Sequence, residues 1–452
     1  MSTTWTSIAR VGVLTACVAL GWGCSSSGGN TDASVAADVV AEAGDAPDGT
    51  EPEAVTPDVG ADTAPAEPAL VTEARRLGLL DYLEGGPVPV VEAEDGDTTT
   101  YRFEPGAPGE MGPLCMRGDP FRFAVRDTGS DTLVVFLQGG GACWSEFCFV
   151  VTGAPPGIPD VQTVDATEPL NPLAGYSVLY LPYCDGSFFA GEADVDEDGD
   201  GQPDRFHRGL ANLGGALRTG LQRFPAPSRV ILIGSSAGGY GTILATLLVR
   251  GAWPEASLRV MSDSGVGLAR PDDPGFLATI AAEHNVLRLI PSTCVDCLTS
   301  GQLTPLVAWT LERDPEVRVA VFSSFYDTII GAIFLGLPAE TFRDLLLAQT
   351  GSVHDRFPDR YRRFLAAGVT HTSTLGDPTG IVGSDPTAVE MKLKLFDLLD
   401  ILEIGGLERT KIGDVRMADW LKAFVTDAPD WVDRVDEPGP VPDKYGRALS
   451  IR

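Results

Sequence analysis

Short apolar segments that end in small or polar residues alternate with longer helical segments along most of the chain. Segments rich in β-branched and aromatic residues, which are typical of strands, cover 132–137, 176–181, 229–233, 258–261, 317–322 and 363–367. Helical stretches cover 210–224, 239–249 and 339–347. Near-continuous apolar strands suit a parallel sheet that is covered on both faces. The pattern therefore predicts an α/β fold with a doubly wound, mostly parallel sheet and helices on both faces.

The turn after the strand 229–233 has the form G-x-S-x-G, with Ser236 at its centre. A nucleophile elbow needs a strand before this turn, a helix after it and small flanking residues, and the pattern supplies all three. Ser236 is therefore the candidate nucleophile, because the helix N-terminus beside it favours developing negative charge. The alternative is an ordinary glycine-rich turn between a strand and a helix.

A run of three glycines, 139–141, follows the strand 132–137. Glycines allow backbone N–H groups to approach an oxyanion without a clashing side chain. The N–H groups of Gly140, Gly141 and Ala237 are therefore expected to form an oxyanion hole. A mobile turn is the alternative interpretation of the glycines.

Five motifs occur in a fixed order along the chain. They are Cys115 with a Gly-Asp-Pro shortly after it, Leu-Gln-Gly-Gly-Gly-Ala-Cys, Leu-Pro-Tyr-Cys-Asp-Gly, Gly-Ser-Ser-Ala-Gly-Gly and Asp-Ser-Gly. In this order they resemble the pectin acetylesterase and Notum family from Cys115 to His371. The resemblance implies an α/β-hydrolase fold and a secreted serine carboxylic-ester hydrolase that removes O-acyl groups, above all O-acetyl groups. It implies no required cofactor.

The chain contains only four histidines, which narrows the choice of a catalytic base. In α/β-hydrolases the order along the chain is serine, acid, histidine, and His207 precedes Ser236. His284 lies in a polar helical stretch, and His354 reads as part of an exposed helix or its end. His371 follows a late strand, where the base belongs, and is the favoured candidate. A surface-loop histidine is the alternative.

The acid should follow an intermediate strand. Asp327 comes after the strand 317–322 and resembles the family segment that carries the triad aspartate. Asp263 is the competitor, although its Asp-Ser-Gly motif resembles a family motif that borders the site. We therefore expect Asp327 to orient His371 and to stabilise its charged form.

Two other functions remain open. A lipase-like or polyester hydrolase would act on longer acyl groups, and the apolar stretch 329–337 could line a pocket for them. A non-catalytic surface binding module would leave His371 far from Ser236. We expect an acylated carbohydrate or another O-acyl ester as substrate, and a monomer.

The first 24 residues resemble a bacterial lipoprotein signal. Arg10 is the only charge before a short apolar run, and Cys24 stands where a lipid anchor would be attached. Cys17 is the alternative lipidation site. Residues 25–72 are predicted to be a disordered linker because they are acidic and rich in Ala and Pro. Residues 73–452 are predicted to form one catalytic domain, exported and either surface-anchored or secreted.

The formal charge of −30 excludes some partners. Removing the ten acidic residues of 31–70 and Arg10 leaves −21 on residues 71–452. Such a charge repels phosphate backbones and anionic lipid, so nucleic-acid binding is not expected. The charge also offers no basic groove for a polyanion such as pectin.

Six cysteines remain after Cys17 and Cys24, which predicts three disulfides in an oxidising compartment. Spacing alone allows 15 connectivities. The resemblance implies the pairs Cys115–Cys184, Cys143–Cys148 and Cys294–Cys297. The last pair could instead be half of a zinc site, but no second pair of ligands accompanies it.

The segment 196–204 reads D-x-D-x-D-G-x-x-D. Alternate carboxylates before a glycine suit Ca²⁺, and the segment resembles the calcium loops of thrombospondin-type repeats. The sequence leaves two interpretations open: a structural calcium site, or a solvated acidic insertion. The candidate ligands are Asp196, Asp198, Asp200 and Asp204.

Overall fold

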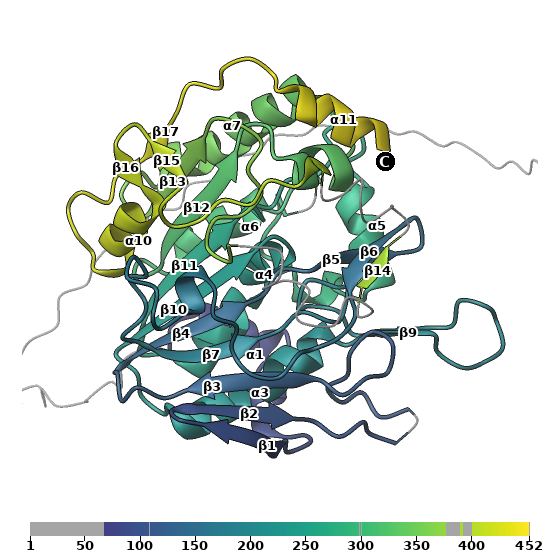
Figure 1. The fold of residues 1–452 in the computed structure, drawn as a ribbon. Coiled ribbons are helices and arrows are strands. Elements are labelled where there is room, and N and C mark those ends of the chain that lie inside the picture. Colours follow the sequence, from purple (N-terminus) through teal and green to yellow (C-terminus); the bar gives the residue numbers. More distant parts are fainter. Residues whose placement is uncertain are drawn as a thin grey trace, which may run out of the picture. The chain divides into compact units, whose positions relative to one another are not determined.

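A large twisted sheet forms the centre of the structure, which is a computed structural model (Figure 1). The structure describes residues 67–107, 109–297, 299, 301–376, 389–391 and 400–451. The predicted signal 1–24, its Cys17 and Cys24, and linker residues 25–66 lie outside the described residues. Within these ranges, the strands of the large sheet lie in the order β1-β2-β3-β7-β4-β10-β11-β12-β13-β17.

The elements have the following bounds. The large sheet contains β1 (Val90–Asp95), β2 (Thr98–Arg102), β3 (Arg122–Arg126), β4 (Thr132–Leu137), β7 (Ser177–Leu181), β10 (Arg229–Ser235), β11 (Ser257–Asp263), β12 (Arg318–Ser324), β13 (Tyr361–Ala366) and β17 (Arg434–Val435). The small sheets contain β5 (Gly141–Trp144), β6 (Phe147–Val151), β14 (Val389–Met391), β8 (Ala193–Val195), β9 (Arg205–His207), β15 (Lys411–Ile412) and β16 (Val415–Arg416). The α-helices are α1 (Ala69–Arg76), α2 (Asp81–Glu84), α3 (Gly209–Arg223), α4 (Ala237–Ala252), α5 (Phe276–Glu283), α6 (Thr304–Arg313), α7 (Ala339–Arg356), α10 (Met417–Val425) and α11 (Asp443–Ile451). Short 3₁₀ turns span Gln162–Val164 and Leu287–Leu289, and a π-helical turn spans Thr328–Phe334.

The strands from β7 to β17 pair in parallel, whereas β1, β2 and β3 add an antiparallel edge beside β7. The six strands predicted from the apolar pattern are all present, as β4, β7, β10, β11, β12 and β13. The predicted α/β class with a mostly parallel sheet is confirmed. The antiparallel edge was not predicted. Its outermost strand, β1, is exposed along its whole length, whereas β2 and β3 are mostly buried but short.

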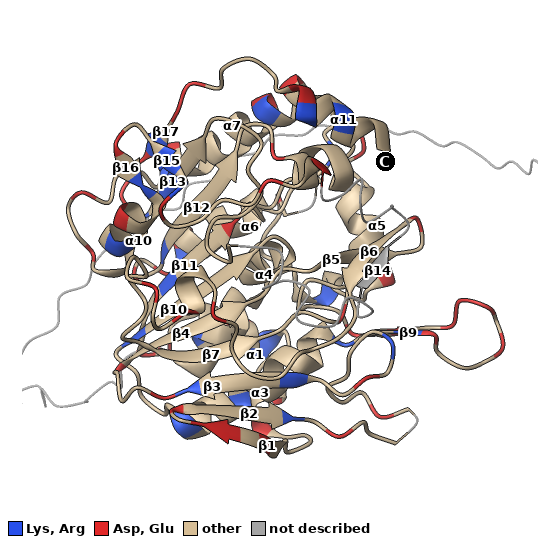
Figure 2. Ribbon diagram, in the orientation of Figure 1, with Lys and Arg blue, Asp and Glu red and all other residues tan. Residues whose placement is uncertain are grey.

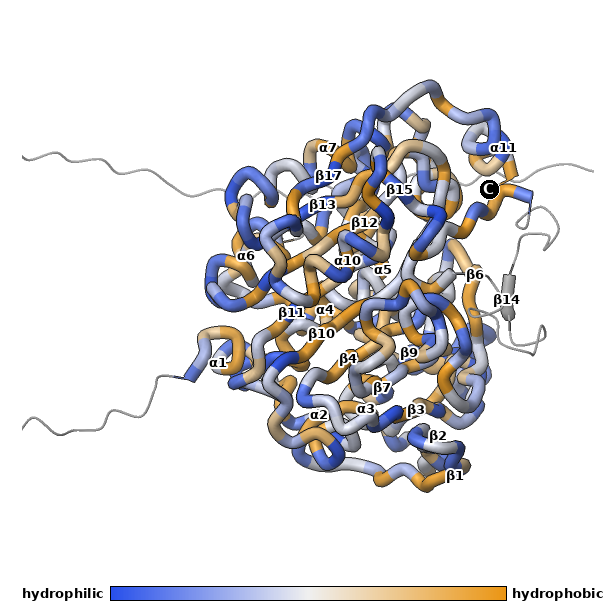
Figure 3. The backbone as a smooth tube through the Cα atoms, turned by 60° about the vertical axis from the view of Figure 1, so that its left-hand side comes forward, coloured by the Kyte–Doolittle hydropathy of each residue, from blue (hydrophilic) through white to orange (hydrophobic). Residues whose placement is uncertain are grey.

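Alternate residues of the central strands face two different cores. In β10, Val230 and Leu232 belong to the core beneath α4, whereas Ile231 and Ile233 belong to the core that contains Trp420 of α10. A strand that is buried on both faces needs apolar side chains at every position, which is the pattern seen in the sequence. Figure 3 shows these strands as an apolar centre within a more polar periphery.

A cluster of charges ties the end of α10 to the sheet. The carboxylate of Asp427 lies 2.8 Å from guanidinium nitrogens of Arg229, Arg259 and Arg318. These arginines come from the neighbouring strands β10, β11 and β12. One carboxylate therefore fixes the loop after α10 against three strands.

The structured domain begins before the predicted boundary at residue 73. Helix α1 starts at Ala69, and Leu70 and Ala74 on it are fully buried in the core. Among the described residues, no helix combines the length and apolar character that a membrane crossing requires.

Candidate active site

A sharp turn places Ser236 between β10 and α4. Its backbone has φ 56° and ψ −117°, a strained combination for a residue other than glycine. A Cβ atom on Gly238 would lie 2.1 Å from the carbonyl oxygen of Leu137, and one on Gly234 would lie 2.2 Å from the carbonyl oxygen of Gly238. Only glycine fits at these two positions, so the turn has the geometry of a nucleophile elbow.

His371 lies between Ser236 and Asp327. Its Nε2 atom is 2.9 Å from Ser236 Oγ, and its Nδ1 atom is 2.9 Å from Asp327 Oδ2. The three side chains are buried: relative exposures are 7% for Ser236, 3% for His371 and 0% for Asp327. The structure thus brings together a serine, a histidine and an aspartate that are up to 135 residues apart.

The carboxylate of Asp327 is fixed in place from its other side. Its Oδ1 atom accepts hydrogen bonds from the backbone N–H groups of Ile329 and Ile330 at 2.9 and 3.0 Å. Ile329 and Ile330 are the second and third residues of the π-helical turn Thr328–Phe334, so Asp327 caps that turn. The His371 ring is consequently held in one orientation.

Asp263, the competing acid, has different partners. Its carboxylate accepts hydrogen bonds from the backbone N–H groups of Ser373 and Thr374 at 2.9 and 2.7 Å, and from Thr374 Oγ1 at 2.5 Å. Burial raises the pKa of this carboxyl. Asp263 therefore anchors the loop that follows His371, whereas Asp327 contacts the imidazole directly.

The glycine run lies against the elbow. A Cβ atom on Gly139 would be 2.9 Å from Cβ of Ser236, and Gly141 has φ +87°. Gly141 and Ala237 line one cavity together with Ser236. Gly140 packs on the ring of Tyr183, and its carbonyl oxygen accepts a hydrogen bond from the N–H of Val151. Gly141 and Ala237 of the predicted oxyanion hole therefore lie beside Ser236, and Gly140 lies between Gly141 and the Gly139 that faces the serine turn.

The cavity beside Ser236 is small and almost wholly apolar. Its free volume is about 30 Å³. One wall comes from the π-helical turn, one from the β5–β6 hairpin and one from α4. The apolar side chains that line it are Ala142, Phe147, Phe149, Phe188, Ile329, Ile330, Ile333 and Phe334, together with the ring of Tyr240.

A second apolar cavity of about 30 Å³ adjoins the first. Phe188 and Tyr240 line both cavities, so their rings form the partition between them. Phe188 has φ 60°, again an unusual value for a large side chain. Neither ring was predicted as a site residue, because only the folded chain brings the segments on the two sides together.

Three disulfides join the pairs that the resemblance implied: Cys115–Cys184, Cys143–Cys148 and Cys294–Cys297. Cys143–Cys148 closes the β5–β6 hairpin, which supplies Phe147 and Phe149 to the cavity. Since Cys294 is bonded to Cys297, this pair is not half of a zinc site.

The acidic segment 196–204 forms an exposed loop between β8 and β9, and Figure 2 shows its concentration of acidic residues. Carboxylate oxygens of Asp196, Asp198 and Asp204 lie within 4.8 Å of one another, and Asp200 is outside this group. The carboxylates also accept hydrogen bonds from N–H groups of the loop itself, such as Gly199 N to Asp196 at 2.7 Å. The calcium site remains a prediction.

Comparison with known families supports the resemblance. Residues 171–315 match the family model described as pectinacetylesterase. The resemblance to pectin acetylesterases is thus confirmed over this segment. The matched segment includes Ser236 and Ala237, whereas Asp327, His371 and the glycine run lie outside it. No curated protein matches the chain. The pectinacetylesterase family indicates a carboxylic-ester hydrolase, with an acetyl ester as the substrate class.

Proposed function

We propose that the protein is a serine hydrolase of carboxylic esters that uses Ser236 as nucleophile, His371 as general base and Asp327 as the orienting acid. The observation that carries this proposal is the chain of two 2.9 Å contacts from Ser236 Oγ through the imidazole to Asp327. A carboxylate can only accept, so Nδ1 carries the ring proton and Nε2 presents a lone pair to the serine hydroxyl.

The reaction would proceed in two steps. Ser236 Oγ forms a bond to the acyl carbon while its proton moves to His371 Nε2. N–H groups of Gly140, Gly141 and Ala237 stabilise the oxyanion, and His371 then protonates the departing alcohol. In the second step His371 takes a proton from water as the water oxygen bonds to the acyl carbon. The bond from this carbon to Ser236 Oγ then breaks, His371 Nε2 returns the proton to Ser236 Oγ, and the acid leaves. No cofactor enters either step.

The size of the cavity favours a short acyl group. A free volume of about 30 Å³ corresponds to room for about two water molecules. An acetyl group fits such a space, whereas a long acyl chain requires the π-helical turn or the Phe188 ring to move. We therefore propose O-acetyl esters, carried by a carbohydrate or another alcohol, as the substrate.

A hydrolase for longer acyl groups is the second candidate. The apolar lining of the cavity and the second cavity behind Phe188 favour it. A series of p-nitrophenyl esters from acetate to octanoate separates the two candidates. The first predicts a kcat/KM that falls beyond butyrate, and the second predicts a kcat/KM that rises with chain length.

The catalytic assignment is tested by Ser236→Ala and His371→Ala, with His354→Gln as the matched histidine control. Each triad variant should lose at least about 10⁴-fold in kcat for p-nitrophenyl acetate while it keeps the wild-type circular dichroism spectrum. Labelling by a fluorophosphonate should likewise require both residues. Ester hydrolysis that survives in Ser236→Ala would refute the mechanism and would favour a binding module or another nucleophile.

We also propose that the protein is exported and tethered by a lipid on Cys24. The three disulfides support an oxidising compartment. Cys24→Ser should release the protein from membranes, whereas Cys17→Ser should leave it bound. The opposite result would place the anchor on Cys17.

A further inference from the structure

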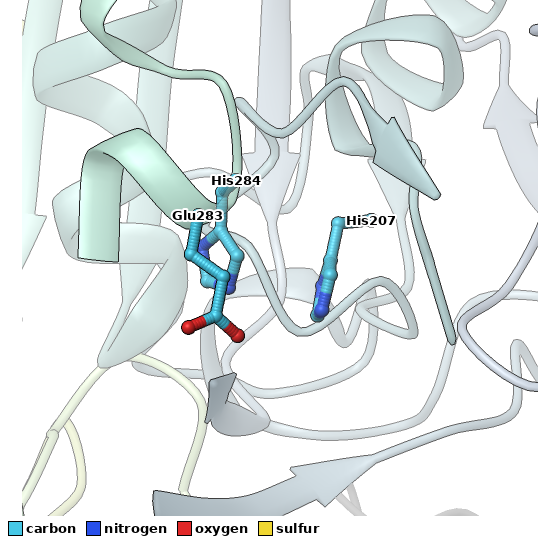
Figure 4. A group of neighbouring side chains, drawn as sticks. All are labelled: His207, Glu283 and His284. Atoms are coloured by element: carbon cyan, nitrogen blue, oxygen red, sulfur yellow. The ribbon is translucent and has the colours of Figure 1, made fainter. Parts of the chain in front are cut away.

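Two buried histidines and a glutamate meet at a place that the proposed reaction does not use. His207 ends β9, and Glu283 and His284 lie at the end of α5, so the two sides come from segments that are far apart in the sequence (Figure 4). One ligand atom from each of the three side chains lies within 4.8 Å of the other two. Both imidazoles have 0% exposure.

The hydrogen bonds of the two rings determine which nitrogens carry protons. His207 Nδ1 lies 2.9 Å from the carbonyl oxygen of Asp185, and His284 Nε2 lies 2.8 Å from the carbonyl oxygen of Cys143. A carbonyl oxygen can only accept, so both of these nitrogens are donors. The opposite nitrogens, His207 Nε2 and His284 Nδ1, are buried and have no hydrogen-bond partner. Each therefore presents a bare lone pair.

A nitrogen lone pair that is buried without a hydrogen-bond donor or a cation beside it destabilises the folded state. The arrangement matches that of metal ligands, which usually donate their second ring N–H to a carbonyl or carboxylate.

Glu283 completes the donor set. Its two oxygens accept from the backbone N–H of Ser145 at 2.8 and 3.1 Å, and Oε1 also accepts from Arg205 at 3.2 Å. Arg205 also pairs with Glu197 at 2.7 Å, so its charge is shared between two carboxylates. A carboxylate offers about four lone-pair sites, which leaves one site of Glu283 for a further ligand.

We propose that His207, Glu283 and His284, with a water molecule as the fourth ligand, bind one zinc ion, or a divalent ion of similar chemistry, at a site with a structural role. Two neutral imidazoles and one carboxylate suit Zn²⁺ and not Ca²⁺ or Mg²⁺. Zinc bonds of about 2.0–2.2 Å would draw the three donor atoms to about 3.4 Å from one another, a closure of about 1.5 Å at most. The Glu283 side chain is 19% exposed and provides the route by which the ion enters.

The site would brace one wall of the cavities. His284 lines the second cavity, and its ring lies 6.5 Å from that of Phe188, which borders Ser236. The carbonyl oxygen that His284 contacts belongs to Cys143 in the β5–β6 hairpin. A bound ion would therefore hold β9, α5 and this hairpin together, without contacting the reacting atoms.

Metal content and metal-dependent stability test the proposal. The purified full chain, loaded with Zn²⁺ and passed through gel filtration, should retain about one zinc ion. His207→Gln and His284→Gln should each lower zinc affinity by at least about 100-fold. His354→Gln, which changes a histidine outside both the triad and the proposed metal site, and Asp198→Asn in the acidic loop should retain zinc. Removal of zinc from the wild type with dipicolinate should lower Tm, and added zinc should restore it.

Three results would overturn the proposal. They are a folded wild type that retains no zinc, equal zinc retention in both histidine variants, or loss of zinc in Asp198→Asn. The first would mean that an ordered water alone occupies the space between the rings. If the histidine variants do not fold, the wild type still tests the proposal. One Co²⁺ ion should bind to each chain and show the visible absorption of a four-coordinate site with nitrogen and oxygen ligands, and the absence of this absorption would refute the assignment.

Discussion

The partition between the two apolar cavities provides a sharp test of acyl specificity. Phe188 borders both the cavity beside Ser236 and the cavity behind it. Replacing its benzyl side chain by a methyl group should join the two spaces. The variant Phe188→Ala should therefore accept longer acyl groups than the wild type does.

The magnitude follows from the burial of methylene groups. Each methylene that moves from water into an apolar cavity contributes about 0.8 kcal/mol, which is about fourfold in kcat/KM. If the joined cavity takes two further methylenes, kcat/KM for hexanoate relative to butyrate should rise by about 15-fold over the wild-type ratio. The same substitution should cost about 3–5 kcal/mol of unfolding free energy, since Phe188 is only 7% exposed.

The assay is a chain-length series of p-nitrophenyl esters, measured below the melting transition of the variant. Leu303→Ala is the matched control, because Leu303 lines only the second of the two cavities. That control should lose stability without changing the wild-type chain-length profile. An unchanged chain-length profile in folded Phe188→Ala would refute the idea that Phe188 separates the two cavities. The same shift in Phe188→Ala and Leu303→Ala would mean that the profile changes because the fold is destabilised.

Four further outcomes can be measured. Asp327→Asn should lower kcat by about 10⁴-fold, because the asparagine no longer holds the His371 ring in the tautomer that has its proton on Nδ1. Asp263→Asn should lower kcat less, and steady-state rates that fall in the reverse order would move the acid to Asp263. Because burial raises the pKa of Asp263, the folded state holds this proton more tightly than the unfolded state does. The unfolding free energy of the wild type should therefore fall as the pH rises through the folded pKa, and urea titrations of Asp263→Asn should lack this decline. In the same titrations Asp427→Asn should lower the unfolding free energy by about 2–3 kcal/mol, because three guanidinium groups lose the carboxylate that they share. Asp419→Asn, which removes an exposed ion pair, should lower it by less than about 1 kcal/mol, and equal losses would contradict this reasoning. If the loop 196–204 binds Ca²⁺, added Ca²⁺ should raise the Tm of the metal-free wild type but not that of Asp198→Ala, and should leave low-temperature activity unchanged; equal melting curves with and without Ca²⁺ would mean a solvated insertion.

Local chemistry made much of this protein predictable. A strand that is buried on both faces must be apolar at every position, so the central strands could be read from their composition. The turn at Ser236 needs small neighbours for steric reasons, and these leave a recognisable string. The order of groups along the chain then favoured His371 as the base, and the family resemblance favoured Asp327 over Asp263 as the acid. The structure places His371 in contact with both Asp327 and Ser236.

Other features depend on contacts between segments that are far apart, and no local pattern marks them. The exposed strand β1 joins the sheet through backbone hydrogen bonds, which any side chain permits. Phe188 and Tyr240 become a partition only when the segment 186–190 packs on α4. His207 and His284 were set aside as bases, one from its position in the chain and the other from its polar surroundings. Their unpaired nitrogens arise because each ring donates to a carbonyl of a distant segment, and only the tertiary structure decides which nitrogen remains bare.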